Sequence, residues 1–167
     1  AKHAGQVRIL NYSGSGIETT FTEGEDACLA SLVPVMPTSA PDAAPQLLLV
    51  GSLPDIVEDQ FLRLFAQLGI ENVGVLPART ADGLPAVGPN TRVLLAQPFL
   101  GETAQALEAR GAQRIDAPFP FGAEGTTAWL KAAGQAFGID EMHANSVIAP
   151  GRERAKRALE HHREKLA

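Results

Sequence analysis

The stretch Leu47-Leu48-Leu49-Val50-Gly51-Ser52-Leu53-Pro54-Asp55 decides the fold class of this chain. It joins a wholly apolar run to the start of a helix. Such a run is typical of a strand that is buried on both faces of a parallel sheet. Pro54 suits the first turn of the helix, and the Asp55 carboxylate suits its positive end. Before Gly69, five apolar residues fall on one helical stripe: Val57, Phe61, Leu64, Phe65 and Leu68.

The same alternation of strand and helix continues along the chain. Apolar runs predict strands near residues 7–10, 73–76, 93–96 and 115, and helices are predicted at 25–33, 102–110, from Thr126 or Thr127 to 137, and after Pro150-Gly151. Helices between strands form βαβ units, whose right-handed crossovers place a parallel sheet between two layers of helices. The predicted fold is therefore α/β, a doubly wound, Rossmann-like parallel sheet.

The predicted domain organisation has three parts. Residues 1–37 hold a leading strand, a Gly/Ser-rich loop and a helix, which are interpreted as the tail of a preceding domain. Residues 46–149 form the Rossmann-like domain, and residues 150–167 form a connecting C-terminal helix. The linker at 38–45 is rich in alanine and proline.

Composition excludes several classes of protein. The chain has 167 residues with a net charge of -5, which argues against a general nucleic-acid binder. No apolar run approaches the roughly 18 residues that a membrane span needs. Residues 152–167 carry six Lys/Arg against three Glu, which indicates a solvated helix or, alternatively, a docking face for an acidic partner. A single cysteine, Cys28, allows no internal disulfide and favours a reducing cytoplasm.

In an open α/β sheet, ligands bind beyond the carboxyl ends of the strands, so the loops at 13–21, 51–55, 97–101 and 118–127 are candidate sites. The first contains Ser13, Gly14, Ser15 and Gly16, and its two glycines allow close approach of a ligand or partner. Thr19 stands where a dinucleotide-binding loop has its third glycine, and no Walker lysine follows. A tight turn packed against a neighbouring domain or subunit is the alternative.

Two other loops carry aromatic residues. Gln97, Pro98 and Phe99 end the predicted third strand of the domain, where an amide and a flat apolar ring could form the wall of a pocket for a large planar ligand. The alternative is a polar strand end with a core phenylalanine. Phe119 and Phe121 flank Pro120 before a glycine-rich helix start, and they form either a rigid aromatic rim or a buried strand exit.

No residue is predicted to be catalytic, and no metal site is predicted. Cys28 is expected to be a buried small hydrophobe, and one cysteine cannot hold an iron–sulfur cluster, which needs about four ligands. The acidic residues near the loops are expected to be solvated: Glu18, Glu25, Asp55, Glu58 and Glu124.

Four stretches together carry a resemblance to a known family: residues 11–29, 49–60, 87–100 and 118–130. Within them, Gly88-Pro89-Asn90-Thr91 together with Gln97-Pro98-Phe99-Leu100 is especially like the family, and the specificity lies in the combination of the four stretches. The chain resembles the N subunits of light-independent (dark-operative) protochlorophyllide reductases, which are nitrogenase-like enzymes of chlorophyll synthesis. It looks like their middle Rossmann-like domain, together with the strand and loop that lead into it.

The resemblance implies an activity for the parent enzyme. That enzyme reduces a ring double bond of protochlorophyllide to give chlorophyllide, with electrons from ferredoxin through an ATP-hydrolysing, iron–sulfur L subunit. An N–B heterotetramer receives the electrons on a four-iron four-sulfur cluster. The family's cluster cysteines lie upstream of this sequence, so the chain is expected to be an inactive segment that binds no cofactor. Its candidate pocket or interface residues are Ser13, Gly14, Ser15, Gly16, Gln97, Pro98, Phe99, Phe119, Phe121 and Thr126.

Two other functions stay open from the residues alone. A free-standing α/β module could bind a small anionic ligand at the Gly14–Gly16 loop. A structural domain without a ligand is the third possibility.

Overall fold

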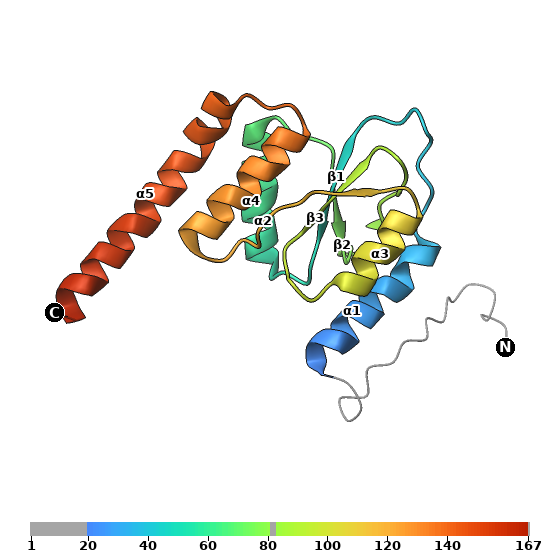
Figure 1. Ribbon diagram of the computed structural model, residues 1–167, viewed down its shortest axis with the longest axis horizontal. Coiled ribbons are helices and arrows are strands. Elements are labelled where there is room, and N and C mark those ends of the chain that lie inside the picture. The colour runs from blue at the N-terminus through green and yellow to red at the C-terminus, as the bar shows by residue number, and fades with distance from the viewer. Residues whose placement is uncertain (1–19, 81–82, 167) are drawn as a thin grey trace.

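The computed structural model describes residues 20–80 and 83–166 (Figure 1). The predicted leading strand and the Gly/Ser loop lie outside these residues. The elements follow in the order α1 (Phe21–Leu32), the short 3-10 helix η1 (Val33–Val35), β1 (Gln46–Val50), α2 (Asp55–Leu68), β2 (Val73–Leu76), β3 (Thr91–Leu95), α3 (Gly101–Ala109), β4 (Gln113–Arg114), α4 (Gly122–Ala136) and α5 (Glu141–Leu166).

The four strands form one parallel sheet in the order β2-β1-β3-β4. Leu48 of β1 lies opposite Gly74 of β2 on one side and Val93 of β3 on the other, so the wholly apolar run occupies the centre of the sheet. Its four residues, 47–50, are fully buried. The predicted α/β class with a parallel sheet is confirmed.

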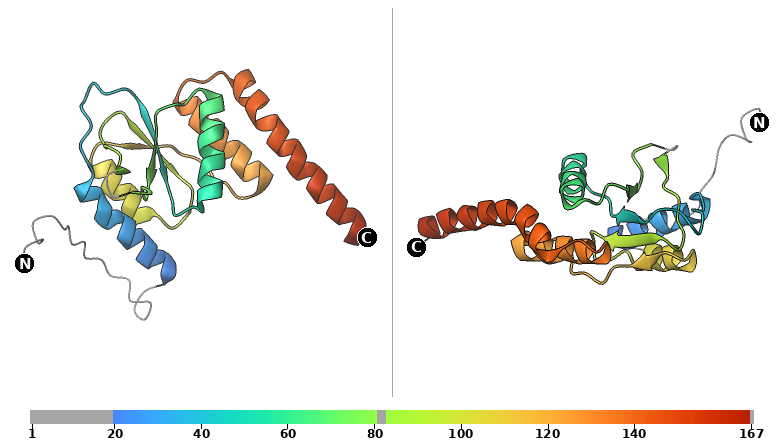
Figure 2. Two further views of the ribbon diagram at one scale, coloured as in Figure 1. Left: turned by 180° about the vertical axis from the view of Figure 1, so that it is seen from behind. Right: turned by 90° about the horizontal axis from the view of Figure 1, so that it is seen from above.

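Helices cover both faces of the sheet, as Figure 1 shows and Figure 2 repeats from behind. Because side chains alternate along a strand, Leu47 and Leu49 pack with α2, α4 and α5 on one face. Leu48 and Val50 pack with α1 and α3 on the other. The two apolar clusters therefore share β1, and the loops at the ends of β1 and β3 connect to opposite layers.

The helix α2 begins and ends where the sequence predicted. Asp55 and Glu58 lie in its first turn, and Gly69 ends it in the left-handed conformation with φ 88°. The rings of Phe61 and Phe65 contact Trp129 of α4, with ring centroids 4.7 and 5.5 Å apart. The predicted apolar stripe thus forms the contact between the two helices.

The predicted start of α4 was wrong. The helix begins at Gly122, several residues before Thr126 and Thr127, and no side chain caps it. The hydroxyls of these threonines donate instead to the carbonyl oxygens of Pro120 and Ala123. Gly122 has φ 65°, a left-handed conformation that glycine adopts without strain, and it sets the turn into the helix.

The predicted break at Pro150-Gly151 was also wrong, because α5 begins at Glu141 and continues through Pro150. Asp140 accepts a hydrogen bond from the backbone N–H of His143 at 3.1 Å, which is a helix N-cap that the proline signal obscured. The buried side chains of Ala144 and Ile148 fix the first turns of α5 on the body of the domain. This packing opposes the cost of an internal proline, which is about 3 kcal/mol. Within the described ranges, no helix is long and apolar enough to cross a membrane.

Candidate functional site

The carboxyl ends of β1 and β3 meet at the point where the sheet changes its winding. From β1 the chain crosses through α2 on one face to β2, and from β3 it crosses through α3 on the other face to β4. Loops that leave adjacent strands in opposite directions open a crevice, which is where α/β proteins bind ligands. The loops concerned are residues 51–54 and 96–100.

A hydrogen bond joins these two loops. The Oε1 atom of Gln97 accepts from the backbone N–H of Ser52 at 3.0 Å, although the residues are 45 positions apart. Gln97 is half-buried, and within residues 20–80 and 83–166 its amide nitrogen donates to no protein atom. The amide is therefore held at the switch point by its oxygen, and its N–H groups are available to another molecule.

Gly51 makes this approach possible. Its φ is 151°, and a Cβ placed there would lie 2.9 Å from Oε1 of Gln97 and 3.1 Å from Cβ of Ala96. A side chain at this position would therefore push the two loops apart. The glycine that ends β1 is a requirement of the site as well as a turn residue.

The other end of the β3 loop is anchored by Asp26, a residue that sequence reasoning missed. This buried carboxylate in α1 accepts from the backbone N–H groups of Glu102 at 2.8 Å and Thr103 at 2.9 Å, and from the Thr103 hydroxyl at 2.6 Å. It caps α3 from a different helix, and its charge suits the positive end of α3. No local pattern in the sequence signals a cap supplied from 77 residues away.

Glu58 was predicted to be solvated but is buried and paired with Arg79, in the loop after β2, whereas Asp55 is exposed as predicted. The Arg79 guanidinium lies 2.8 Å from the buried Glu58, 2.6 Å from Asp59 and 3.9 Å from Asp55. The hydrogen bond with Asp59, aided by the nearby Glu58 and Asp55 charges, raises the pKa of Arg79 above its ordinary value. These carboxylates hold the β2 loop against α2, so the structure gives them a structural role.

The other two candidate residues of the β3 loop, Pro98 and Phe99, have different surroundings. Phe99 is half-buried and packs against the core cluster that lies between the sheet, α1 and α3, whereas Pro98 is exposed. Of the three residues Gln97, Pro98 and Phe99, Gln97 contacts the neighbouring loop at the switch point.

Phe119 lines a hollow at the same edge of the sheet, with a volume of about 470 Å³. This hollow lies beyond the ends of β3 and β4, and its other lining residues are Leu95, Glu108, Arg114, Ile115, Asp116 and Ala117. The ring of Phe121 lies 6.2 Å from that of Phe119 and is 66% exposed. A Cβ at Gly125 would lie 2.6 Å from the Phe119 carbonyl oxygen, so the glycine lets α4 approach this loop closely.

Trp129 of α4 supports this edge of the sheet at the end of β3. Its indole N–H donates to the carbonyl oxygen of Leu95, the last residue of β3, at 2.8 Å, and its side chain is fully buried. Gln97 and Phe119 therefore lie on loops that follow neighbouring strands, β3 and β4, and α4 supports both. Thr126 lies on the flank of α4 with its hydroxyl on Pro120, while Ser13, Gly14, Ser15 and Gly16 lie outside the described residues.

The described part of the chain has no set of side chains that could bind a metal ion. No group of three His, Cys, Asp or Glu side chains within it could hold a metal ion. Cys28, the single cysteine of the sequence, is half-buried in α1. A four-iron cluster needs about four such ligands, so the residues present do not fit it.

Comparison with known proteins gives a consistent result. The family model described as nitrogenase component 1 type oxidoreductase matches residues 1–167. The light-independent protochlorophyllide reductase subunit N of Rhodospirillum rubrum is 64% identical over 164 residues, which is 98% of this chain and 37% of that protein. The subunits N of Bradyrhizobium sp. (strain ORS 278) and Rhodopseudomonas palustris (strain TIE-1) are each 63% identical, over 96% and 92% of the chain and 38% and 35% of their own lengths. The chain thus spans somewhat more than a third of the curated relatives that it matches.

Proposed function

The chain belongs to the nitrogenase component 1 type oxidoreductases, and from this premise we propose that it forms part of the N subunit of a light-independent protochlorophyllide reductase. The observation that carries the proposal is 64% identity to one such subunit across 98% of the chain. The resemblance seen in the sequence motifs is confirmed at the level of the family. The whole enzyme would reduce a ring double bond of protochlorophyllide.

Within that enzyme, the carboxyl edge of the sheet forms part of the wall of the substrate cavity. Two features support this role. Gln97 offers N–H donors at the switch point of the sheet, and the half-buried Phe119 lines a hollow beside it. A large planar pigment is bound by flat apolar surfaces together with a few placed polar groups, which is what this edge provides.

The redox cofactor of the enzyme is held elsewhere in this proposal. A four-iron four-sulfur cluster and its ligands belong to other parts of the complex, because the sequence has a single cysteine and the described residues include no group of side chains that could hold a metal ion. The proposed partners are a B subunit in an N–B heterotetramer and, transiently, an ATP-hydrolysing L subunit that receives electrons from ferredoxin. The complex works in the reducing cytoplasm, where a single free cysteine such as Cys28 persists.

The domain division also stays a proposal. Residues 46–149 form the Rossmann-like unit, residues 1–37 belong to a preceding domain, and residues 150–167 connect to a following one. The anchoring of α3 by Asp26 ties the first part firmly to the second.

A chimeric enzyme tests the proposed function. The 167 residues replace the matching region of the Rhodospirillum rubrum subunit N, and the complex is assembled with the other subunits of that enzyme. We expect the chimera to convert protochlorophyllide to chlorophyllide in the dark with ATP and reduced ferredoxin, at a rate within about tenfold of the parent, since a tenfold change reflects only about 1.4 kcal/mol in the barrier.

The matched control is the same chimera with Trp129→Ala, which removes the support of the β3 edge and is expected to fail. A correctly assembled chimera that binds the L subunit but reduces no pigment would overturn the proposal.

A further inference from the structure

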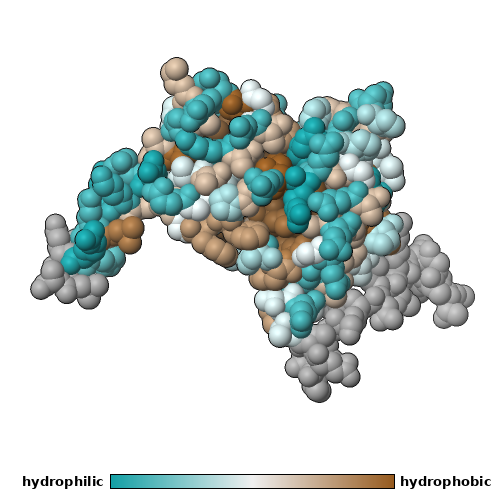
Figure 3. All heavy atoms as spheres, viewed as in Figure 1, coloured by the Kyte–Doolittle hydropathy of each residue, from teal (hydrophilic) through white to brown (hydrophobic). Residues whose placement is uncertain are grey.

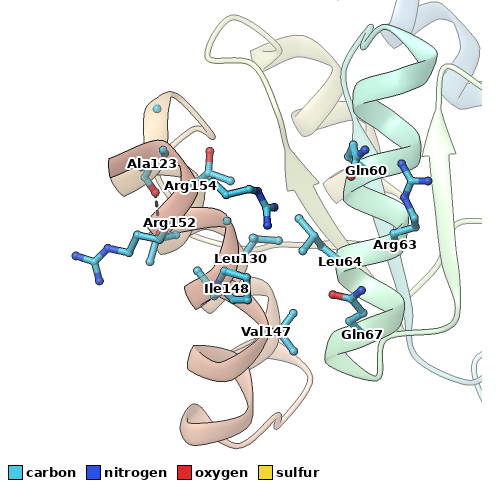
Figure 4. Close-up of a pocket in the computed structure, with 16 residues that line it drawn as sticks. Gln60, Arg63, Leu64, Gln67, Ala123, Leu130, Val147, Ile148, Arg152 and Arg154 are labelled. Atoms are coloured by element: carbon cyan, nitrogen blue, oxygen red, sulfur yellow. Dashed lines mark hydrogen bonds between the residues drawn. The ribbon is translucent and has the colours of Figure 1, made fainter. Parts of the chain in front are cut away.

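A large hollow lies on the face opposite to α1 and α3. It is a groove of about 650 Å³ between α2, α4 and α5, here called the α5 groove. Leu64, Leu130 and Ile148 form an apolar floor, and Figure 4 shows these side chains gathered between the helices. Its volume and apolar floor are those of a binding surface, and the function proposed above does not use it.

The apolar floor continues along α5 beyond the body of the domain. Ala144 and Ile148 are buried against α4 and α2. Ala155 and Leu159 follow at positions 11 and 15 after Ala144, which places all four on one face of the helix. Ala155 lines the groove, but Leu159 is 63% exposed.

The part of α5 that follows the groove, residues 156–166, is here called the α5 overhang, and Figure 1 shows the C-terminal end of α5 projecting away from α2 and α4. In Figure 3 it is an arm that is mainly hydrophilic, with a hydrophobic patch near the end of its described side chains. The same helical face therefore lies against the groove as far as Ala155 and is uncovered at Leu159. A helix that keeps its apolar stripe where no partner lies in the described residues is a docking element.

The charges around this surface are basic. Residues 152–163 contain five Lys/Arg and two Glu. Arg63 of α2 and Arg154 of α5 line the groove from opposite walls, and neither forms an ion pair with a residue in the ranges 20–80 and 83–166. In Figure 4, Arg154 points into the space in front of α2, whereas Arg152 points away and pairs with Glu124 at 3.2 Å.

We propose that the α5 groove and the α5 overhang together receive an acidic amphipathic helix supplied by the part of the same subunit that lies outside these 167 residues. The 11 residues of the overhang are about 16 Å long at 1.5 Å per residue, which is enough to lie along three turns of a partner helix. The partner's apolar stripe covers Ala155 and Leu159, and its carboxylates meet Arg63 and Arg154. This is the helix-in-groove mode of recognition with complementary charge.

The source within the same subunit is favoured by two observations. The chain spans 37% of the length of its Rhodospirillum rubrum relative, so under the proposed function, on which this inference rests, most of the subunit lies outside it. A segment tethered to the same chain also meets the groove at an effective concentration of the order of millimolar, so a small surface is sufficient to hold it.

Thiol labelling tests the proposal. Leu159→Cys is introduced on a Cys28→Ser background, both in the 167-residue chain and in the whole subunit of which we propose it to be part. Labelling is followed at residue 159 by mass spectrometry of its peptide, so that cysteines elsewhere in the subunit do not contribute to the measured rate. We expect the new thiol to react with iodoacetamide at least about tenfold more slowly in the whole subunit, because the docked helix must open before the reagent can enter. The matched control is Gln105→Cys, on an exposed position of α3, which should react at the same rate in both proteins.

A second pair of variants tests the charge. In the whole subunit carrying Leu159→Cys, Arg154→Glu should restore fast labelling, because it places like charge against the acidic helix. Arg154→Lys keeps the positive charge and should leave the thiol protected.

Three outcomes overturn the inference. The first is equal labelling of Leu159→Cys in the chain and the whole subunit. The second is protection that requires another subunit, since the occupant then comes from a different chain. The third is protection that persists with Arg154→Glu. Reductase activity is measured separately. A thiol that is protected in an enzyme without reductase activity would contradict the proposed function but not the docking inference.

Discussion

The carboxylate of Asp26 in α1 accepts three hydrogen bonds from α3, two of them from the backbone N–H and hydroxyl of Thr103, 77 positions further along the chain. Because α3 follows directly from the loop that carries Gln97, this cap determines where that loop leaves the sheet. The hydrogen bond of Gln97 to the β1 loop and the Asp26 cap on Thr103 therefore lie at the two ends of one short segment.

Asp26→Ala should destabilise the domain strongly. It leaves two backbone N–H groups and a buried hydroxyl without their acceptor. A hydrogen bond to a charged group contributes about 1.5–3 kcal/mol to stability. We expect a loss of about 2–4 kcal/mol in the free energy of unfolding, measured by urea titration. Asp42→Ala, in the exposed linker, should change it by less than about 0.5 kcal/mol; a comparable loss there would show that the effect is not due to the cap.

Gly51→Ala should separate the β1 and β3 loops. The added Cβ would meet Oε1 of Gln97 and Cβ of Ala96 in a backbone conformation that favours glycine, and we expect a destabilisation of about 1–3 kcal/mol. Gln97→Ala in the same protein should recover part of this loss, because it removes the closer of the two contacts. A double-mutant cycle measures the coupling, and additive losses would contradict the predicted contact.

Gln97→Ala should weaken substrate binding in the assembled reductase. If the N–H groups of Gln97 donate to the pigment, their removal costs about 1.4 kcal/mol, which corresponds to a roughly tenfold increase in KM or decrease in kcat/KM. Steady-state absorbance assays of chlorophyllide formation give both constants. Gln105→Ala on α3 serves as the control; unchanged kinetics in both variants would place the pigment away from this edge.

The first turn of α1 should depend on acid pH. Glu23 closes a capping box in which Thr20 donates to its carboxylate, and these hydrogen bonds, the backbone one above all, lower the pKa of Glu23. A lowered pKa in the folded state means that the stabilisation is present above the ordinary glutamate pKa of about 4.3 and is lost as pH falls through the lowered value.

An NMR titration of the Glu23 carboxyl should therefore give a midpoint below the ordinary glutamate pKa of about 4.3. Glu23→Gln should remove the pH dependence of amide protection in this turn. A midpoint at the ordinary glutamate value would show that the capping box does not form in solution.

Trp129→Phe should lower the free energy of unfolding because it removes the indole N–H. The ring is retained in part, but the Leu95 carbonyl loses its donor and the smaller ring leaves a cavity among Phe61 and Phe65. We expect a loss of about 2–3 kcal/mol in the free energy of unfolding. Calorimetry measures it, with the partly buried Phe137→Leu as the reference for a simple change of volume; equal losses would assign the Trp129 effect to volume alone.

The sequence by itself determined the fold class and the family. A short apolar run such as residues 47–50, bounded by Gly51, is typical of a strand buried on both faces, and the helix after it had readable signals in Asp55 and Gly69. Local signals failed where two of them competed, as when Pro150 obscured the start of α5 at Asp140.

Only the tertiary structure decided which polar groups meet. Ser52 and Gln97 are 45 positions apart, Arg79 reaches back to Glu58, and Asp26 caps a helix that is 77 positions away. Each of these side chains looks like an ordinary polar residue in its own stretch of sequence, because its partner is chosen by strand order and by the face on which each helix packs. Hydrophobic periodicity is a property of neighbours along the chain, whereas a cap or an ion pair between distant segments exists only after the sheet has brought them together.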